Sequence, residues 1–215
     1  MENLSALSIF GLVLITGLAP MLVMMMTSFA KISVVLFIVR NALGVQQTPP
    51  NLLLNGLALI LTVYVMMPVG RDVYAVATSP RASYSTIAGW ERTVGEAAQP
   101  VRGFLIKHTH ARERKFFADA TQRLWKDTGQ PAAQETDFAV LVPAFLATEL
   151  TRAFEIGFLL YLPFVMIDFA VSAILIAVGM QMMSPTVIST PFKLLLFVLI
   201  DGWSLLLQGL VLSYV

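Results

Sequence analysis

Residues 3–30 contain no charged side chain. A helix on the surface of a soluble protein carries polar and charged residues on its outer face, so an uncharged stretch of this length requires an apolar solvent. The composition agrees, because hydrophobic residues make up 57% of the chain and charged residues 13%, with a mean hydropathy of +0.78. Soluble domains contain about 25% charged residues. We therefore expect an all-α integral membrane protein.

Polar and apolar residues are unevenly distributed along the chain. Most charged residues lie between residues 70 and 138. This predicts an N-terminal hydrophobic hairpin region (1–69), a polar helical domain (70–138) and a C-terminal hydrophobic hairpin (139–215). A helix needs about 20 residues to cross a bilayer. Four apolar segments have about this length or more: residues 4–26, 52–69, 156–183 and 192–215.

Several features argue against four simple crossings. Residues 32–39 form a further apolar run that is too short to span a bilayer. Residues 184–191 contain two prolines and are expected to form a turn joining the last two helices, as Pro49-Pro50 does for the first pair. Some segments are therefore expected to be hairpins. Four residues interrupt the apolar segments: Pro20, Pro163, Asp168 and Asp201.

The short connections carry positive charge. If all four segments cross, the connections after the first and third lie on one side of the membrane and hold Lys31, Arg40 and Lys193, with no acid. Basic residues in short loops favour the cytoplasm. This side is therefore expected to be cytoplasmic, with the central domain and both termini on the other side.

Three ionisable residues lie close together at Glu149, Arg152 and Glu155. The spacing i, i+3, i+6 places acid, base and acid along one helix face, where neighbours can pair. A charge at the bilayer centre costs on the order of 2.5–3.5 kcal/mol even on insertion scales, so these side chains must face protein or water. We expect the three side chains to neutralise one another.

Asp168 and Asp201 lie in the third and fourth apolar segments, and Lys193 precedes Asp201 by eight residues on roughly the same helical side. Lys193 and Asp168 can meet across the hairpin. These three residues, with the group around Arg152, are predicted to determine assembly by pairing within or between subunits. A proton relay through Asp168 and Asp201 is the alternative.

Three methionines, Met180, Met182 and Met183, stand just before the proline-rich segment 184–191. Methionine is flexible and uncharged, and by default such a cluster is ordinary core or lipid contact.

Motifs for phosphate loops, zinc proteases and serine hydrolases are absent from the sequence, as is cysteine. His108 and His110 have no further ligand at metal-site spacing. We expect no enzymatic activity, cofactor, metal or nucleic-acid partner.

Six motifs spread over nearly the whole chain resemble one known family. They look like signatures of the SctR/FliP family, the R-type core subunit of the type III secretion export apparatus. Glu155 stands before Ile156 where flagellar members are expected to have Gln, which favours the injectisome branch (YscR or HrcR type) over the flagellar one. The motifs are 27–32 (TSFAKI), 40–51 (RNALGVQQTPPN), 149–158 (ELTRAFEIGF), 162–168 (LPFVMID), 179–185 (GMQMMSP) and 191–203 (PFKLLLFVLIDGW).

The resemblance implies a multi-pass subunit of a protein export gate in the bacterial inner membrane, with its central domain on the periplasmic side. Copies of the subunit, as a pentamer, would join S-type and T-type subunits in a helical assembly around the channel. The U-type switch protein, unfolded secreted proteins and membrane lipid are the other implied partners. Energy would come from a separate ATPase and the proton motive force.

The resemblance also gives the methionines a role, because the family places its methionine gasket at this motif. Met180, Met182 and Met183 are then expected to form the pore constriction. The chain departs from the family pattern at Gln181 and Ser184, where Met and Pro are expected. Two other functions remain open: a proton-coupled small-solute transporter using Asp168 and Asp201, and a scaffold for another channel.

Overall fold

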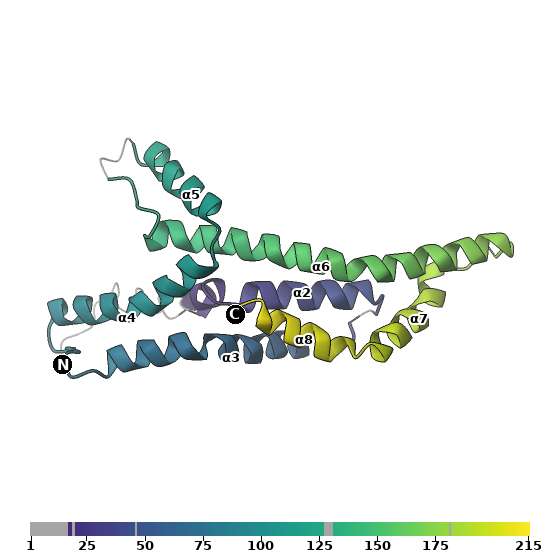
Figure 1. Ribbon diagram of the computed structural model, residues 1–215, viewed down its shortest axis with the longest axis horizontal. Helices are drawn as coiled ribbons and strands as arrows, with labels where there is room; N and C mark the ends of the chain where they lie inside the picture. Colours follow the sequence, from purple (N-terminus) through teal and green to yellow (C-terminus); the bar gives the residue numbers. More distant parts are fainter. Residues whose placement is uncertain (1–16, 19, 46, 127–130, 181) are drawn as a thin grey trace. The chain divides into compact units, whose positions relative to one another are not determined.

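The computed structural model describes residues 17–18, 20–45, 47–126, 131–180 and 182–215 (Figure 1). Within these ranges the chain forms helices and connections only, which confirms the expected all-α class. The helices with described bounds are α2 (Phe29–Ala42), α3 (Asn51–Ala77), α4 (Ile87–His108), α5 (Ala111–Leu124), α6 (Phe138–Ala177), α7 (Pro185–Leu199) and α8 (Gly202–Leu212), and residues 20–25 are helical as well.

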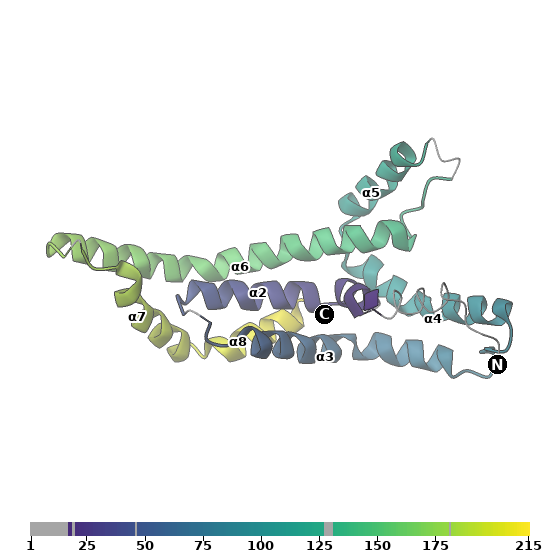
Figure 2. The same cartoon turned by 180° about the vertical axis from the view of Figure 1, so that it is seen from behind.

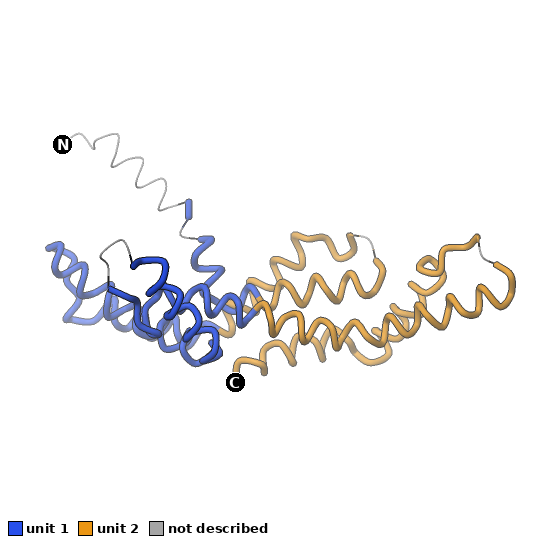
Figure 3. Tube along the Cα trace, turned by 90° about the horizontal axis from the view of Figure 1, so that it is seen from above, with its two compact units in different colours: residues 1–30, 66–149 blue, residues 31–65, 150–215 orange. Residues whose placement is uncertain are grey.

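The chain forms two compact units, each made from two stretches of sequence (Figure 3). Unit 1 comprises residues 1–30 and 66–149, and unit 2 comprises residues 31–65 and 150–215. Helices α3 and α6 each contribute residues to both units. The boundaries expected from the sequence, at residues 69 and 138, follow polarity rather than packing and stay a prediction.

Unit 1 has a small apolar core between α4 and the first turns of α6. Leu105 of α4 and Leu141 and Phe145 of α6 are completely buried. The rings of Phe104 and Phe145 lie 5.7 Å apart in a tilted arrangement. The spacing of Leu141 and Phe145, four residues apart, places both on the helix face that packs against α4.

Hydrogen bonds fasten α5 to the end of α4 and to α6 within unit 1. Arg114 donates from one guanidinium nitrogen to the carbonyl oxygens of Ile106, at 3.0 Å, and Thr109, at 3.1 Å. The backbone N–H of His110 donates to the Thr148 hydroxyl at 3.2 Å. Carbonyls at a helix end and N–H groups at a helix start lack partners within the helix, so these contacts satisfy both termini.

Unit 2 begins with a hairpin made by α2 and the first part of α3. Ile32, Val35, Leu36 and Val39 of α2 are at most 1% exposed, at the i, i+3, i+4, i+7 spacing of one helix face. The connection that contains Pro49-Pro50 joins α2 to α3, and the two helices run in opposite directions away from it (Figure 2). The expected pair of segments, 4–26 and 52–69, stays a prediction, because residues 4–26 lie mostly outside the described residues.

Arg40 closes this turn from the end of α2. Its guanidinium donates to the carbonyl oxygen of Pro49 at 3.2 Å and to Asn51 Oδ1 at 2.5 Å. A basic residue that reaches from the last turn of a helix to nearby acceptors also interacts favourably with the helix dipole. Arg40 therefore has a structural role in the hairpin.

Helix α6 is one continuous helix of 40 residues. The expected start of this segment at residue 156 is therefore wrong, as is its interruption at Pro163 and Asp168, because α6 runs through both. A proline is tolerated in an apolar helix where neighbouring structure satisfies the backbone groups that it frees. Asp168 is tolerated because it has charged and polar partners, described below.

The turn expected over residues 184–191 is also wrong. Pro185 is the first residue of α7 and Pro191 lies inside it. The first position of a helix suits proline, since its N–H would have no partner there in any case. Near Pro191, the Thr190 hydroxyl donates back to the carbonyl oxygen of Thr186 at 2.7 Å. The connection between α6 and α7 is instead residues 178–184.

Two helices, α3 and α6, are long and apolar enough to cross a membrane. Helices α7 and α8 pass the same test only as a pair, and they bend by 63° at the break between them. The described part of the chain therefore offers two spans, or three if the bent pair counts as one, instead of four. The expected first segment, residues 4–26, lies mostly outside the described residues.

The charges used to predict orientation do not lie in free connections. Lys31 is 0% exposed within α2, where its Nζ lies 3.5 Å from the centre of the Tyr214 ring, and Lys193 is 2% exposed within α7. Both lysines are therefore buried in helices instead of lying in solvated loops, and nothing in the structure tests the positive-inside argument. The orientation itself stays a prediction.

Candidate functional site

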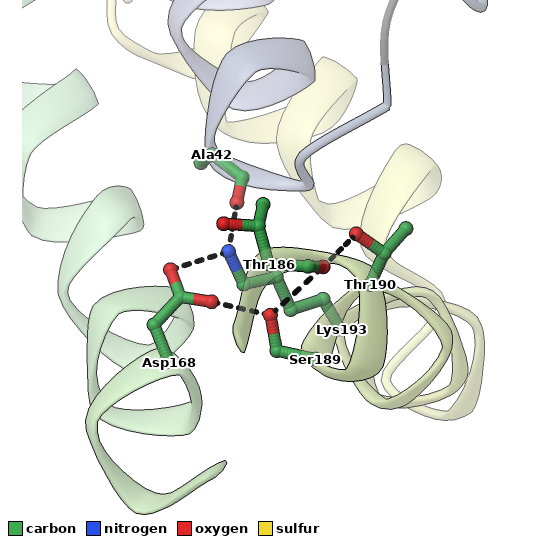
Figure 4. Close-up of polar contacts among 6 residues, drawn as sticks. All are labelled: Ala42, Asp168, Thr186, Ser189, Thr190 and Lys193. Atoms are coloured by element: carbon green, nitrogen blue, oxygen red, sulfur yellow. Dashed lines mark hydrogen bonds and ion pairs between the residues drawn. The ribbon is translucent and has the colours of Figure 1, made fainter. Parts of the chain in front are cut away.

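A buried ion pair joins α6 to α7 within unit 2 (Figure 4). Lys193 Nζ of α7 lies 2.6 Å from Asp168 Oδ2 of α6 and also donates to the carbonyl oxygen of Ala42, at the end of α2, at 3.1 Å. The Lys193 side chain is 3% exposed and the Asp168 side chain 34%. The predicted meeting of Lys193 and Asp168 across the hairpin is confirmed.

Ser189 completes the ion-pair cluster, which we define as Asp168, Ser189, Lys193 and the Ala42 carbonyl. The Ser189 hydroxyl is fully buried and donates to Asp168 Oδ1 at 2.5 Å. Both carboxylate oxygens therefore have a donor, which offsets the cost of removing a charge from water. Sequence reasoning missed Ser189 because it was assigned to a turn. Its spacing of four residues from Lys193 is the signal that a helix assignment would have revealed.

Residues 178–184, which we call the methionine loop, connect the two helices that the cluster joins. The backbone turns at Gly179, whose φ of +77° is in the left-handed region that glycine adopts without steric cost. The N–H of Met180 donates to the carbonyl oxygen of Leu175 at 2.9 Å. Such a bond satisfies an acceptor that the end of α6 leaves open, so the start of the loop is anchored on α6.

The methionine loop exposes its apolar side chains. Met182 is fully exposed, Met180 is 46% exposed and Met183 is 39% exposed. Gln181, where the sequence departs from the family pattern, lies outside the described residues. Long apolar side chains exposed together indicate a surface that contacts something beyond the chain itself.

The three charged residues in the first half of α6 have different surroundings. Glu149, in unit 1, is completely buried, whereas Arg152 and Glu155, in unit 2, are half-buried and exposed. The burial of Glu149 identifies it as the member of this group for which a substitution would be most costly. Pairing among the three stays a prediction.

Asp201 lies at the break between α7 and α8 and is exposed. Its backbone angles, φ 53° and ψ 47°, are left-handed, a conformation that Asp and Asn tolerate better than other residues with a side chain. The expected alignment of Asp201 with Lys193 on one continuous helix is therefore wrong, since the helix ends between them. Asp201 marks a bend in the chain.

Together these features define a class: an all-helical membrane protein in which a methionine loop joins two apolar helices held together by a buried ion pair. The chain belongs to the FliP family, whose family model matches residues 12–210. This confirms the family expected from the six sequence motifs.

Named relatives cover nearly the full length of the chain. It is 49% identical over 208 residues to the probable translocation protein y4yL of Sinorhizobium fredii (97% of this chain, 94% of the relative). It is 50% identical over 197 residues to Yop proteins translocation protein R of Yersinia pestis (92% and 91%). The hypersensitivity response secretion protein HrcR of Ralstonia nicotianae is 45% identical over 216 residues (100% of each chain).

Proposed function

We propose that this chain is a subunit of the export gate of a type III secretion system, of the injectisome kind, and that its methionine loop forms the constriction of the closed pore. Relatives named for translocation or secretion support this assignment. The observation that carries it is the full exposure of Met182 on a loop whose two flanking helices are joined by a buried ion pair.

The physical requirements of such a gate match the methionine loop. A closed gate must exclude water and ions, and an apolar constriction does so by dewetting. An open gate must pass unfolded polypeptide of any sequence, so its lining must adapt without losing fixed hydrogen bonds. Methionine has three rotatable bonds and no charge, and Met180, Met182 and Met183 would therefore form a deformable ring when several copies assemble.

The assembly that we propose is a pentamer of this chain together with S-type and T-type subunits, with the U-type switch protein and unfolded secreted proteins as transient partners. Large exposed apolar side chains on α6, including Phe154, Phe158 and Met166 at 61–66% exposure, support contact with other subunits or lipid. We assign no catalytic step to this chain. Energy would be supplied by other components of the apparatus.

We place this protein in the bacterial inner membrane, with residues 70–138 on the periplasmic side. The chain contains no cysteine, so an Arg92→Cys variant carries a single reactive thiol. An impermeant maleimide added to cells with a permeabilised outer membrane should label it. Labelling that requires rupture of the inner membrane would place the region in the cytoplasm instead.

The gate proposal is tested by replacing Met180, Met182 and Met183 with Ala. The assembled complex should form in normal yield, and its resting conductance in planar bilayers should rise, because shorter side chains leave a wider pore. A matched control replaces three methionines outside the loop, Met66, Met67 and Met166. A loop variant that assembles and conducts no more than this control would refute the assignment.

A further inference from the structure

We infer that Ser189 and the turn after α2 are positioning residues for the methionine loop: they hold the first two turns of α7 against α6 and so fix where the loop closes. This inference deepens the proposed function and rests on it for its consequence in the pore. The contacts that carry it are independent of that function.

The position of Ser189 along α7 is the first argument. Ser189 lies four residues after Pro185, where α7 begins, and Lys193 lies one turn further from the loop. Both reach the same carboxylate, Ser189 at Asp168 Oδ1 and Lys193 at Asp168 Oδ2. The serine therefore fastens α7 to α6 one helical turn nearer to the methionine loop than the ion pair does.

The start of α7 also needs support from outside the helix. Pro191 has no N–H, so the helix lacks one of its backbone hydrogen bonds at this point. The Ser189 hydroxyl has two acceptors within reach, the Thr186 carbonyl at 3.3 Å and Asp168 Oδ1 at 2.5 Å. It has a single hydrogen to donate, and the nearer, charged acceptor receives it in the stronger bond. The Ser189 hydroxyl thereby links α7 to α6 instead of bonding to a carbonyl oxygen within α7.

The turn after α2 makes a second contact with α7, separate from the one with α6 (Figure 4). Lys193 donates to the carbonyl oxygen of Ala42, a residue 151 positions away in sequence. Gly44, with φ +72°, lies two residues after Ala42, and a Cβ on Gly44 would lie 3.0 Å from Thr190 Oγ1 and 3.9 Å from Lys193 Nζ. The turn therefore approaches α7 so closely that a side chain at residue 44 would push against it.

Lys193 and Ser189 have different roles in these contacts. Lys193 neutralises Asp168 and binds the end of α2, so its loss damages the unit as a whole. Ser189 carries no charge, and its loss leaves the ion pair with its remaining partners. A Ser189→Ala variant should therefore fold and assemble while the start of α7 and the methionine loop move more freely.

The test uses the assembled complex with a spin label on a single cysteine at Met182→Cys, in a chain that has no other cysteine. A hydrogen bond to a charged group is strong enough that removing it should raise the population of displaced loop about tenfold or more. In the Ser189→Ala background the label should become more mobile. Ser189→Thr, which keeps the hydroxyl, should resemble the parent. Ser213→Ala removes a hydroxyl that bonds only to the Leu210 carbonyl oxygen of α8 and is the matched control.

A second pair of variants tests the turn after α2. Gly44→Ala adds a Cβ against Thr190 in a backbone conformation that disfavours side chains, whereas Gly56→Ala, in α3, meets nothing within 4 Å. Only Gly44→Ala should mobilise the label at residue 182. The inference is overturned if Ser189→Ala leaves the label as immobile as Ser213→Ala does, or if Ser189→Thr loosens the loop as much as Ser189→Ala.

The two proposals fail separately. If the methionine-to-alanine variant leaks and Ser189→Ala neither leaks nor mobilises the label, the gate assignment stands and the positioning role is wrong. If the methionine variant does not leak, the gate assignment falls, and label mobility still decides whether Ser189 positions the loop.

Discussion

The two units of the molecule use ion pairs in contrasting surroundings. In unit 1, Arg112 pairs with its neighbour Glu113 at 2.9 Å with the arginine side chain 89% exposed, and Arg114 lies 3.7 Å from a half-exposed Glu135. In unit 2, Lys193 lies 2.6 Å from Asp168, and the lysine side chain is 3% exposed and the aspartate side chain 34%. Each pair joins a basic to an acidic side chain, but the pairs differ in how far they are exposed to water.

This difference determines what each pair can do. Exposed pairs contribute about 0–1 kcal/mol because water and salt screen them and side-chain entropy opposes them. A buried pair adds little net stability over an apolar substitute, yet removing one partner strands the other at a cost of about 3–5 kcal/mol. The Arg112–Glu113 and Arg114–Glu135 ion pairs are therefore replaceable, whereas the Lys193–Asp168 pair of unit 2 fixes which parts of α6 and α7 meet.

The largest expected effect follows from Lys193→Ala, which strands the Asp168 carboxylate. We expect a loss of about 2–3 kcal/mol in the stability of unit 2, below the range for a fully buried pair, because Asp168 is 34% exposed and keeps the Ser189 donor. It should be seen as a lower thermal transition and a low yield of assembled complex. Lys107→Ala, at an exposed lysine of α4, is the control and should behave as the parent. The double variant Asp168→Asn with Lys193→Met should recover part of the yield. If Lys193→Ala assembles normally, the ion pair of unit 2 is as replaceable as the exposed pairs of unit 1.

An intermediate effect is expected for Thr148→Val in unit 1. This change keeps the shape of a fully buried side chain but removes the acceptor for the His110 N–H. The loss should be about 1 kcal/mol, measured as faster proteolysis around the start of α5. Thr78→Val removes an exposed hydroxyl, one residue after α3, that bonds only to the Tyr74 carbonyl oxygen of α3, and it should have no effect on α5. Equal cleavage rates in both variants would show that Thr148 does not hold this junction.

The smallest effect is expected for Arg112→Ala. Its exposed pair should be worth less than about 1 kcal/mol, and adding salt should abolish even this difference, because screening is strong within a few ångströms at high ionic strength. The measurement is the thermal transition of the parent and variant at low and high salt. A loss comparable to that of Lys193→Ala would mean that exposure does not separate the two kinds of pair.

The sequence predicted the helical class, the family and the contact between Asp168 and Lys193, because each depends on local composition, motifs or the geometry of one hairpin. It failed at residues 184–191, where two prolines were assigned to a turn. Proline at the first position of a helix costs nothing, and Pro191 is tolerated inside an apolar helix. The prolines therefore mark the start and a weak point of α7.

Other parts of the site could not be predicted from local patterns. The bond from Lys193 to Ala42 joins residues 151 positions apart, and the close approach of Gly44 to Thr190 depends on how the α2–α3 hairpin packs. Neither residue type signals such a contact, since alanine contributes only its backbone. The burial of Glu149 beside the exposure of Glu155 likewise depends on packing, because their spacing alone places both on one helix face.

The distance between the ion-pair cluster and the methionine loop has a mechanical consequence. Asp168 lies nine residues before the end of α6, which is a lever arm of about 14 Å at the rise of an α-helix. With the cluster as fulcrum, a tilt of about 10° displaces the loop by about 2 Å, close to the size of a methyl group. Small rotations at this joint between α6 and α7 are thereby amplified at the tip, and in the gate that we propose any force on the loop would act on the joint with the same leverage.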